Sequence, residues 1–363
     1  FAITPNIDKL SENATVFLNN QTQLAICAAS RVSFLTGLRP DKTRVWDLKT
    51  KMRDMNPDVL TLPEHFKNNG YQTIGVGKIY DPRAVDSGRD RRSWSQPFIT
   101  QNKLTFPEGY SFPAGGFYQG KENREIRGKL RKEAIAKGVD NINKYESERY
   151  KPPYEKADVP DGAYVDGAIA NKAVEVLENI DTSQPFFLAV GFILTHLPFN
   201  APTKYWDLYD RSSIPVASDP FIPENVHQNS IGRMGEFYNY ELSDEKPTLE
   251  KPLSDEYSRK LIHGYFASIS YIDNLIGKLM IELKSLDLHK NTMIVLWGDH
   301  GWHLGNDRKW GKHTLFERSL KSALIIKLPG DRHSKREINT VVESVDLYPT
   351  ITVSYTHLRA HET

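Results

Sequence analysis

Titratable side chains follow three separate apolar stretches that are expected to be strands. They are Lys78, His196 and the adjacent pair Asp299 and His300. In an open α/β sheet, ligands bind beyond the carboxyl ends of the strands, so these side chains are expected to meet at one edge of the sheet. Such a convergence of polar, titratable groups would be unusual for purely structural residues, so it indicates a functional site.

Asp299 and His300 stand between two glycines, directly after an apolar run. An Asp–His pair at a strand end is more often a structural cap or a satisfied hydrogen bond than a pair of ligands. The functional interpretation is metal binding by a carboxylate and an imidazole from adjacent positions. A hard ion such as Ca²⁺ takes oxygen ligands readily, and histidine is a less usual ligand for it.

The chain has a single cysteine, Cys27, in the string Cys-Ala-Ala-Ser-Arg at residues 27–31. A solitary cysteine cannot form an internal disulfide, and most cysteines of this kind are small buried hydrophobes. The residues alone therefore leave packing and nucleophilic chemistry equally open. One cysteine also gives no disulfide framework, so cysteine usage does not decide the cellular compartment.

Composition sets the class of protein. The chain has 363 residues, of which 39% are hydrophobic and 26% are charged, and this suits a soluble globular protein. Its formal net charge is +1, so no overall field favours nucleic acid or a membrane surface, and no apolar run is long enough to span a bilayer. Four arginines cluster locally, which usually marks a solvated loop and otherwise a contact for an anionic substrate: Arg83, Arg89, Arg91 and Arg92.

Helices and strands are expected to alternate along the chain. The expected helices are a short one opened by residues 4–7, then 30–38, 61–70, 161–180 and a long one from Ser254, and the expected strands are 71–77, 185–192, 292–297 and 323–328. This order favours an α/β fold with a mostly parallel central sheet and helices on both faces. A charged segment at 122–138 is expected to be an exposed helix. The long stretches 81–118 and 212–252 are expected to be irregular.

The chain resembles the type I sulfatases over most of residues 4–352. The resemblance rests on motifs that occur in the family's order: the Cys27 string, Gly77-Lys78, His196-Leu197-Pro198-Phe199, Gly298-Asp299-His300-Gly301 and Trp310-Gly311-Lys312. The pair Asp299-His300, in place of the Asp-Asn of arylsulfatases, is similar to the iduronate-2-sulfatase branch. The resemblance implies the alkaline-phosphatase-like sulfatase fold.

The resemblance also implies a reaction, the hydrolysis of a sulfate ester on a sugar from a glycosaminoglycan or an algal polysaccharide. A maturation enzyme would oxidise Cys27 to formylglycine, whose hydrate is the nucleophile. A divalent ion such as Ca²⁺ would be held by Asp299, His300 and the residue at position 27. Such sulfatases are exported, to the periplasm, the extracellular space or a lysosome-like compartment, although no signal region is visible in this chain.

The remaining implied roles concern the substrate. Lys78 and Lys312 would hold the sulfate, and Arg31 would hold the nucleophile's hydroxyl or the carboxylates of the metal site. His196 would bind the substrate and protonate the departing sugar oxygen. Asp81 stands where the branch carries a histidine, and its carboxylate would act at the substrate as a base.

The ends of the chain depart from the family pattern. The family's paired metal-binding aspartates lie upstream of the Thr-Pro-Asn-Ile-Asp segment at residues 4–8, and this chain begins after them. We therefore expect residues 1–352 to be a catalytic domain truncated at both ends, with an incomplete sheet and poor metal binding. Residues 353–363 are expected to be a non-native tail that breaks the preceding helix, so His357 and His361 are excluded from the site.

Two alternatives stay open. One is a phosphate monoester or diester hydrolase of the same superfamily, which usually carries serine or threonine as its nucleophile. The other is a non-catalytic relative that binds carbohydrate. The expected partner is a sulfated carbohydrate substrate, with no nucleic acid and no membrane span.

Overall fold

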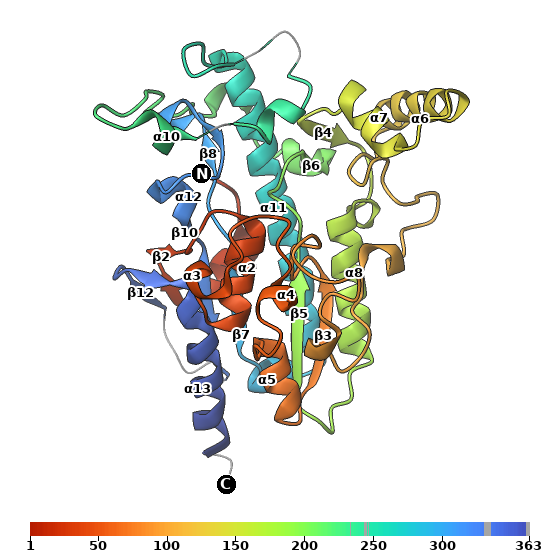
Figure 1. The fold of residues 1–363 in the computed structure, drawn as a ribbon. Coiled ribbons are helices and arrows are strands. Elements are labelled where there is room, and N and C mark those ends of the chain that lie inside the picture. Colours follow the sequence, from red (N-terminus) through yellow and green to blue (C-terminus); the bar gives the residue numbers. More distant parts are fainter. Residues whose placement is uncertain (233, 243–244, 246, 330–334, 361–363) are drawn as a thin grey trace.

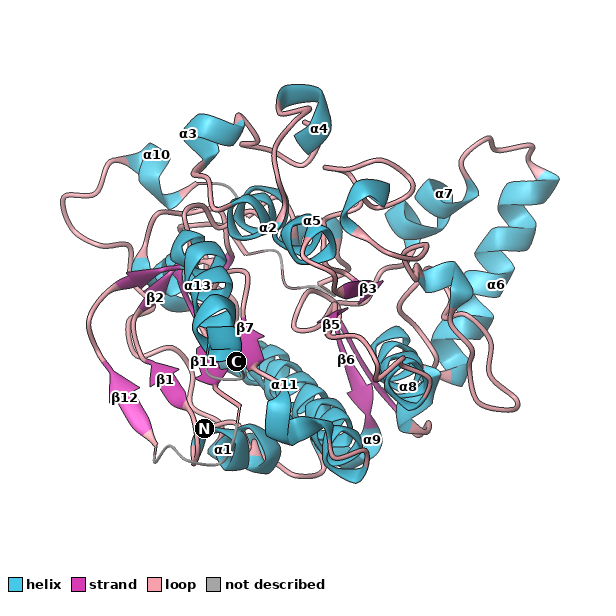
Figure 2. Cartoon of the chain, turned by 90° about the horizontal axis from the view of Figure 1, so that it is seen from below, coloured by secondary structure: helices cyan, strands magenta, loops and turns pink. Residues whose placement is uncertain are grey.

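Two groups of strands lie between helices on both sides (Figures 1 and 2). The computed structural model describes residues 1–363 except 233, 243–244, 246, 330–334 and 361–363. The first group is a four-stranded sheet in the order β12 (Arg336–Ile338), β1 (Thr15–Phe17), β11 (Leu324–Lys327) and β7 (Ile294–Trp297). The second is the parallel pair β3 (Gln72–Gly77) and β5 (Phe186–Gly191).

Figure 2 shows helices on either side of these strands. On one side lie α2 (Cys27–Thr36), α5 (Leu62–Asn68) and α13 (Leu347–Ala360). On the other side lie α1 (Pro5–Ser11), α8 (Val165–Glu178) and the long α11 (Asp255–Ser285). The predicted α/β class is confirmed. The sheets are mixed, because β11 runs antiparallel to both of its neighbours while β1 and β12 are parallel.

The strands β5 and β7 are less buried than their apolar sequences predict. Both are mainly half-buried along their length. Among the described residues, β5 pairs only with β3, and β7 pairs only with β11. Each of these strands therefore has a hydrogen-bonded neighbour on one edge alone.

Local sequence signals place the ends of the main helices. The hydroxyl of Thr61 accepts a hydrogen bond from the backbone N–H of Glu64 at 3.3 Å, and that of Ser254 accepts one from Tyr257 at 3.2 Å. Helix α2 ends where Gly37 adopts a φ of 66° and its N–H bonds to the carbonyl of Ser33. The same helix begins at Cys27, three positions before the predicted start at Ser30. Its N-cap residue is Ile26, which has no capping side chain, so no sequence signal marks this start.

The predicted exposed helix at 122–138 is observed as α6 (Lys121–Ala136). It packs on α7 (Ile142–Arg149), and a buried ion pair between Arg127 and Glu146 at 2.9 Å joins the two helices. The remaining elements are short: β2 (Asn20–Gln21), α3 (Pro40–Thr43), α4 (Met52–Met55), β4 (Tyr154–Ala157), β6 (Phe199–Pro202), α9 (Thr203–Trp206), α10 (Gln228–Ile231), β8 (His303–Leu304), β9 (Trp310–Gly311), α12 (Glu317–Leu320), β10 (Lys321–Ser322) and β13 (Val342–Glu343).

The prediction that residues from 353 onward break the last helix is wrong. Helix α13 runs on to Ala360, and residues 353–360 contain no glycine or proline that would stop it. The remaining residues, 361–363, with His361 among them, lie outside the described part of the chain.

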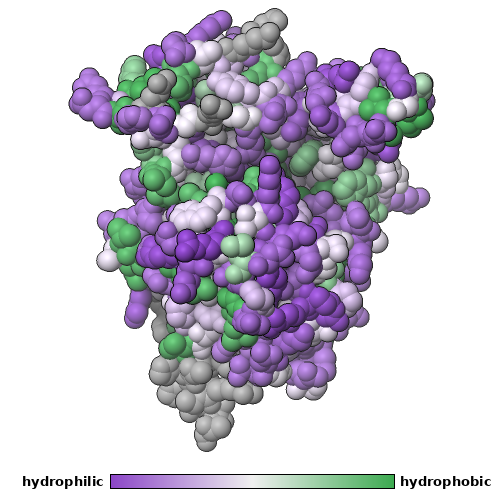
Figure 3. Space-filling model, viewed as in Figure 1, coloured by the Kyte–Doolittle hydropathy of each residue, from purple (hydrophilic) through white to green (hydrophobic). Residues whose placement is uncertain are grey.

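Hydrophobic side chains on the face shown in Figure 3 lie in small separate groups on a mainly hydrophilic surface. In the part of the chain that the structure describes, no helix is long and apolar enough to cross a membrane.

Helix α1 docks on α11 through polar groups as well as apolar ones. The carboxylate of Asp273, which is 1% exposed, accepts hydrogen bonds from the backbone N–H groups of Asn6 and Ile7 at 3.1 and 2.7 Å. It also accepts one from the side-chain amide of Asn6 at 2.7 Å, which fixes that side chain. A Cβ at Gly277 would lie 2.3 Å from Asn6 Oδ1, so only glycine fits at this crossing.

Two helical glycines therefore predict opposite effects of substitution by alanine. Gly277→Ala gains about 1 kcal/mol of helix propensity and loses roughly 1–3 kcal/mol to overpacking, so we expect lower stability. Gly128→Ala, in α6 with no atom within 4 Å of the new Cβ, is the matched control and should be up to about 1 kcal/mol more stable. Urea unfolding of both variants measures this, and a Gly277→Ala variant at least as stable as the parent contradicts the docking described.

Candidate active site

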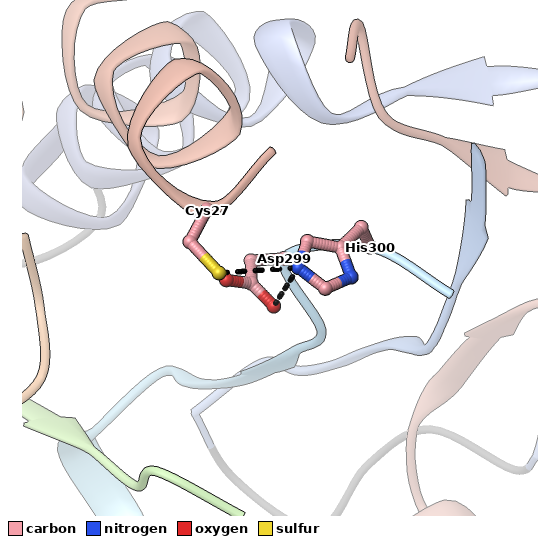
Figure 4. A group of neighbouring side chains, drawn as sticks. All are labelled: Cys27, Asp299 and His300. Carbon is pink, nitrogen blue, oxygen red and sulfur yellow. Dashed lines mark hydrogen bonds and ion pairs between the residues drawn. The ribbon is translucent and has the colours of Figure 1, made fainter. Parts of the chain in front are cut away.

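Cys27 lies in the first turn of α2, and its side chain points at Asp299 and His300, as Figure 4 shows. Its Sγ is 3.2 Å from Nε2 of His300 and 3.5 Å from Nζ of Lys312. Cys27 is 3% exposed. The only cysteine of the chain is therefore a buried group that faces charged and titratable side chains, rather than a member of an apolar cluster.

A cavity of about 60 Å³ opens in front of Cys27. It is lined by residues from the ends of β3, β5 and β7, together with residues of α2 and α11 and residues near β9. The lining residues are Cys27, Arg31, Lys78, Phe192, Ile193, Leu194, Thr195, His196, Tyr265, Asp299, His300, Gly301, Trp302 and Lys312. The structure thus brings all the predicted site residues except Asp81 to one cavity.

Arg31 connects three parts of the site. Its Nε donates to Oδ2 of Asp299 at 2.8 Å, and the same guanidinium donates to the backbone carbonyl of Lys78. Burial raises the pKa of Asp299, but the charges of Arg31, His300 and both cavity lysines outweigh burial and hold this pKa well below its usual range. Asp299 is therefore ionised at neutral pH.

The thiol of Cys27 has a perturbed pKa for a related reason. Burial and the negative charge of Asp299 raise the pKa, while Lys312, Lys78 and His300 lower it. The positive charges win, and the pKa of Cys27 falls to about 5. A site that stabilises a thiolate also stabilises other negative charge at this position, such as an oxyanion.

His196 lies on a segment that a buried carboxylate holds in place. Asp166 accepts hydrogen bonds from the backbone N–H groups of Ile193 and Leu194 at 2.7 and 3.0 Å. Burial raises the pKa of Asp166 to about 6, although both hydrogen bonds and the charge of Lys78 act against that rise. His196 Nδ1 is 2.6 Å from the carbonyl oxygen of Leu197, which orients the ring.

Glu236 is a site residue that the sequence analysis missed. Its Oε1 is 2.7 Å from Nε2 of His196, and its Oε2 is 3.3 Å from Nζ of Lys312. Burial raises the pKa of Glu236, but His196 and Lys312 outweigh burial and hold it well below its usual range. Glu236 lies in the irregular stretch 212–252 among other acidic residues, so no spacing or motif distinguishes it.

Asp81 does not line this cavity. Its side chain is 1% exposed, and its two oxygens accept from Nε and Nη2 of Arg83, each at 2.9 Å. The half-exposed guanidinium of Arg83, rather than the carboxylate, faces solvent. Another arginine of the cluster, Arg92, forms an ion pair with Glu64 at 3.0 Å and so has a structural partner.

The donor atoms of Cys27, Asp299 and His300 lie within 4.8 Å of one another. One carboxylate, one imidazole and the group at position 27 suit a divalent cation in chemistry. Ca²⁺ takes about six to eight oxygen ligands, however, and Oδ2 of Asp299 already accepts from Arg31. Within the described residues, this cluster is therefore short of a full calcium site.

A buried cysteine at a helix start, facing an ionised carboxylate and flanked by cations at the strand ends of an α/β fold, suits the binding of an anion. Residues 2–353 match the family described as Sulfatase, and the chain belongs to the sulfatase family.

Curated relatives agree with this assignment. The chain is 33% identical to iduronate 2-sulfatase of Mus musculus over 332 residues, covering 90% of this chain and 55% of that protein. It is 30% identical to a sulfatase of Formosa agariphila over 364 residues, covering 96% of this chain and 63% of that protein. The chain thus spans between half and two thirds of the length of these two relatives.

Solved structures support the fold. The crystal structure of the phosphonate monoester hydrolase of Agrobacterium radiobacter aligns with a TM-score of 0.66 and 18% identity, over 97% of this chain and 68% of that one. A putative sulfatase from Bacteroides fragilis aligns with a TM-score of 0.61 and 19% identity, over 97% of this chain and 68% of that one. The alkaline-phosphatase-like sulfatase fold implied by the motifs is confirmed.

The lowered pKa of Cys27 predicts a thiolate in the unmodified chain at neutral pH. Ultraviolet absorbance of the thiolate, with Cys27→Ser as the blank, should titrate with a midpoint near pH 5 instead of the usual value of about 8.5. Lys78→Met removes a positive charge and should move the midpoint upward. A midpoint at the usual value in the parent chain would show that the cations do not act on Cys27.

The donor set predicts weak calcium binding by this chain. Calorimetric titration should give a dissociation constant no tighter than roughly 10⁻⁴–10⁻³ M, because one free carboxylate oxygen and one imidazole replace little of the ion's hydration shell. Asp299→Asn should remove the remaining binding. Submicromolar binding to the parent chain would overturn this expectation.

Proposed function

We propose that this chain is the catalytic part of a sulfuric ester hydrolase that removes sulfate from a sugar. The observation that carries the proposal is the meeting of Cys27, Asp299, His300 and Lys312 in one cavity of a sulfatase-family chain. The identity of 33% to proteins named iduronate 2-sulfatase supports a sulfated uronide as the substrate class.

The cations of the cavity suit a sulfate ester. Lys78 and Lys312 both line the cavity, and both act electrostatically on the residue at position 27. As compact charges, they would neutralise the sulfuryl oxygens while leaving the sulfur open to attack. Arg31 would not be free for this task, because its guanidinium already holds Asp299 and the Lys78 carbonyl.

Position 27 is where the nucleophile would stand. Formylglycine made from Cys27 would supply a hydrated aldehyde, and a bound divalent ion such as Ca²⁺ would activate one of its oxygens. The chain's own contribution is charge and placement. The cluster that lowers the pKa of the thiol would equally favour a deprotonated oxygen there, and the Arg31–Asp299 ion pair fixes the carboxylate beside it.

His196 would act at the leaving group. Its segment is fixed by Asp166, and its ring lines the same cavity as Cys27 and Lys78. An imidazole delivers a proton near neutral pH, which a sugar alkoxide needs as it departs. Asp81 is not included in this scheme as a contact, since its oxygens bind Arg83, and Arg83 would face the substrate in its place.

The proposal extends to partners and location. The substrate would be a sulfated carbohydrate fragment, and a formylglycine-generating enzyme would act on the chain before catalysis. An exported location would fit both, because sulfated polysaccharides lie outside cells or in lysosome-like compartments.

The mass of the Cys27 peptide tests the proposal. The chain produced with a maturation enzyme should carry formylglycine at position 27 and hydrolyse sulfated uronides, while Cys27→Ala should lose at least roughly 1,000-fold in kcat because the nucleophile is absent. A panel that adds sulfated hexosamines and phosphate esters sets the substrate class. Full activity with an unmodified thiol, or preference for a phosphate ester, would reject the sulfatase mechanism.

A further inference from the structure

Glu236 joins an imidazole and an amine that the proposed reaction uses for different tasks, His196 and Lys312. Its Oε1 is 2.7 Å from Nε2 of His196, and its Oε2 is 3.3 Å from Nζ of Lys312. The same Nζ is 3.5 Å from Sγ of Cys27. A continuous row of polar contacts therefore runs from the nucleophile position to the imidazole.

The ring of His196 has an acceptor at each nitrogen. Nδ1 is 2.6 Å from the carbonyl oxygen of Leu197, and Nε2 is 2.7 Å from the carboxylate of Glu236. Neither of these oxygens can donate when Glu236 is ionised, so both contacts are hydrogen bonds only when the ring carries two protons. The geometry thus favours His196 as a proton donor.

The two cations depend on Glu236 to different degrees. Lys312 Nζ also lies 5.2 Å from the ring centroid of Trp302 and contacts Cys27. For Nε2 of His196, by contrast, Glu236 is the acceptor that the described residues provide. Loss of the carboxylate should therefore affect the imidazole more than the lysine.

Apolar anchors hold the backbone around Glu236 independently of its carboxylate. Met234 and Phe237 are 4% and 1% exposed, and the ring of Phe237 stacks on Trp310 with centroids 5.7 Å apart. The side chain of Glu236 is 25% exposed by contrast. Its substitution by glutamine should leave the loop packed, so an effect on the reaction can be separated from an effect on folding.

We propose that Glu236 is a positioning residue that holds His196 doubly protonated, with Nε2–H on its carboxylate until the departing sugar oxygen takes that proton. This inference rests on the proposed sulfatase function and adds a residue to it. Glu236 itself touches neither the sulfur nor the departing oxygen.

The step that Glu236 supports balances as follows. An oxygen at position 27 forms a bond to sulfur, and the bond between sulfur and the sugar oxygen breaks with its electron pair left on the sugar oxygen. That oxygen approaches beside Glu236 and takes the proton that Nε2 of His196 had donated to the carboxylate, so the Nε2–H bond and its hydrogen bond to Glu236 are both lost. The ring becomes a neutral imidazole that still donates from Nδ1 to the Leu197 carbonyl. Glu236 stays ionised throughout, and its charge offsets that of the protonated ring beforehand.

A comparison of kcat on substrates with different leaving groups distinguishes a role in proton donation from a purely structural role of Glu236. A sugar alkoxide is a poor leaving group and needs the proton, whereas a nitrophenolate departs without one. We expect Glu236→Gln to lower kcat on a sugar sulfate roughly 10- to 100-fold, to lower kcat on nitrophenyl sulfate less than about 3-fold, and to change KM little. Glu236→Asp should recover part of the loss, and the exposed Glu224→Gln of the same loop should match the parent.

Three results would overturn the proposal. Equal losses on both substrates indicate a structural role. A lower KM with unchanged kcat indicates that Glu236 only repels the anionic substrate, and parental kinetics indicate no role.

Side-chain ¹⁵N spectra of His196 at the assay pH test the protonation of the ring even in an inactive chain. Both ring nitrogens should carry protons in the parent and not in Glu236→Gln. A parent chain that hydrolyses neither ester yet shows this difference would reject the sulfatase function while leaving the contact confirmed.

Discussion

The ion pair between Arg31 and Asp299 is the interaction on which the rest of the site depends. It joins the first turns of α2 to the end of β7, two elements that are far apart in the sequence, and Arg31 also reaches the end of β3 through the Lys78 carbonyl. A buried carboxylate of this kind is costly unless paired. Because Arg31 pairs it, Asp299 can stay ionised beside Cys27 and keep the strand ends in fixed relation.

Around that pair, charges decide what position 27 can do. The thiol is buried, and burial alone would keep it neutral. Three cations reverse that effect, and one of them, Lys312, is itself held by Glu236, Trp302 and the sulfur. The site therefore forms a network in which each buried charge has an opposite neighbour, and removal of any one partner changes the others.

The sequence analysis predicted most of this arrangement because its signals are local. Apolar runs followed by Lys78, His196 or Asp299 mark strand ends, and ligand sites of α/β proteins form beyond such ends. The structure places all three residues at one cavity. Glu236 was not predicted as a site residue, because it lies in an irregular loop and no periodic sequence pattern predicts the path of such a loop. The antiparallel direction of β11 was not predicted either. A short apolar sequence is typical of a buried strand in a parallel or in an antiparallel sheet, so it does not indicate the direction of the strand.

Asp81 and Glu236 show why residue type alone does not assign a role. Both are carboxylates near cations, and the place of Asp81 in the sequence had favoured it as the residue that acts at the substrate. Its neighbour Arg83 is two residues away and donates to both of its oxygens in a paired contact. Glu236 instead divides its oxygens between His196 and Lys312, one bond each. A carboxylate shared between His196 and Lys312 helps to fix the positions of both side chains, whereas the carboxylate of Asp81, bound twice by one arginine, fixes that arginine.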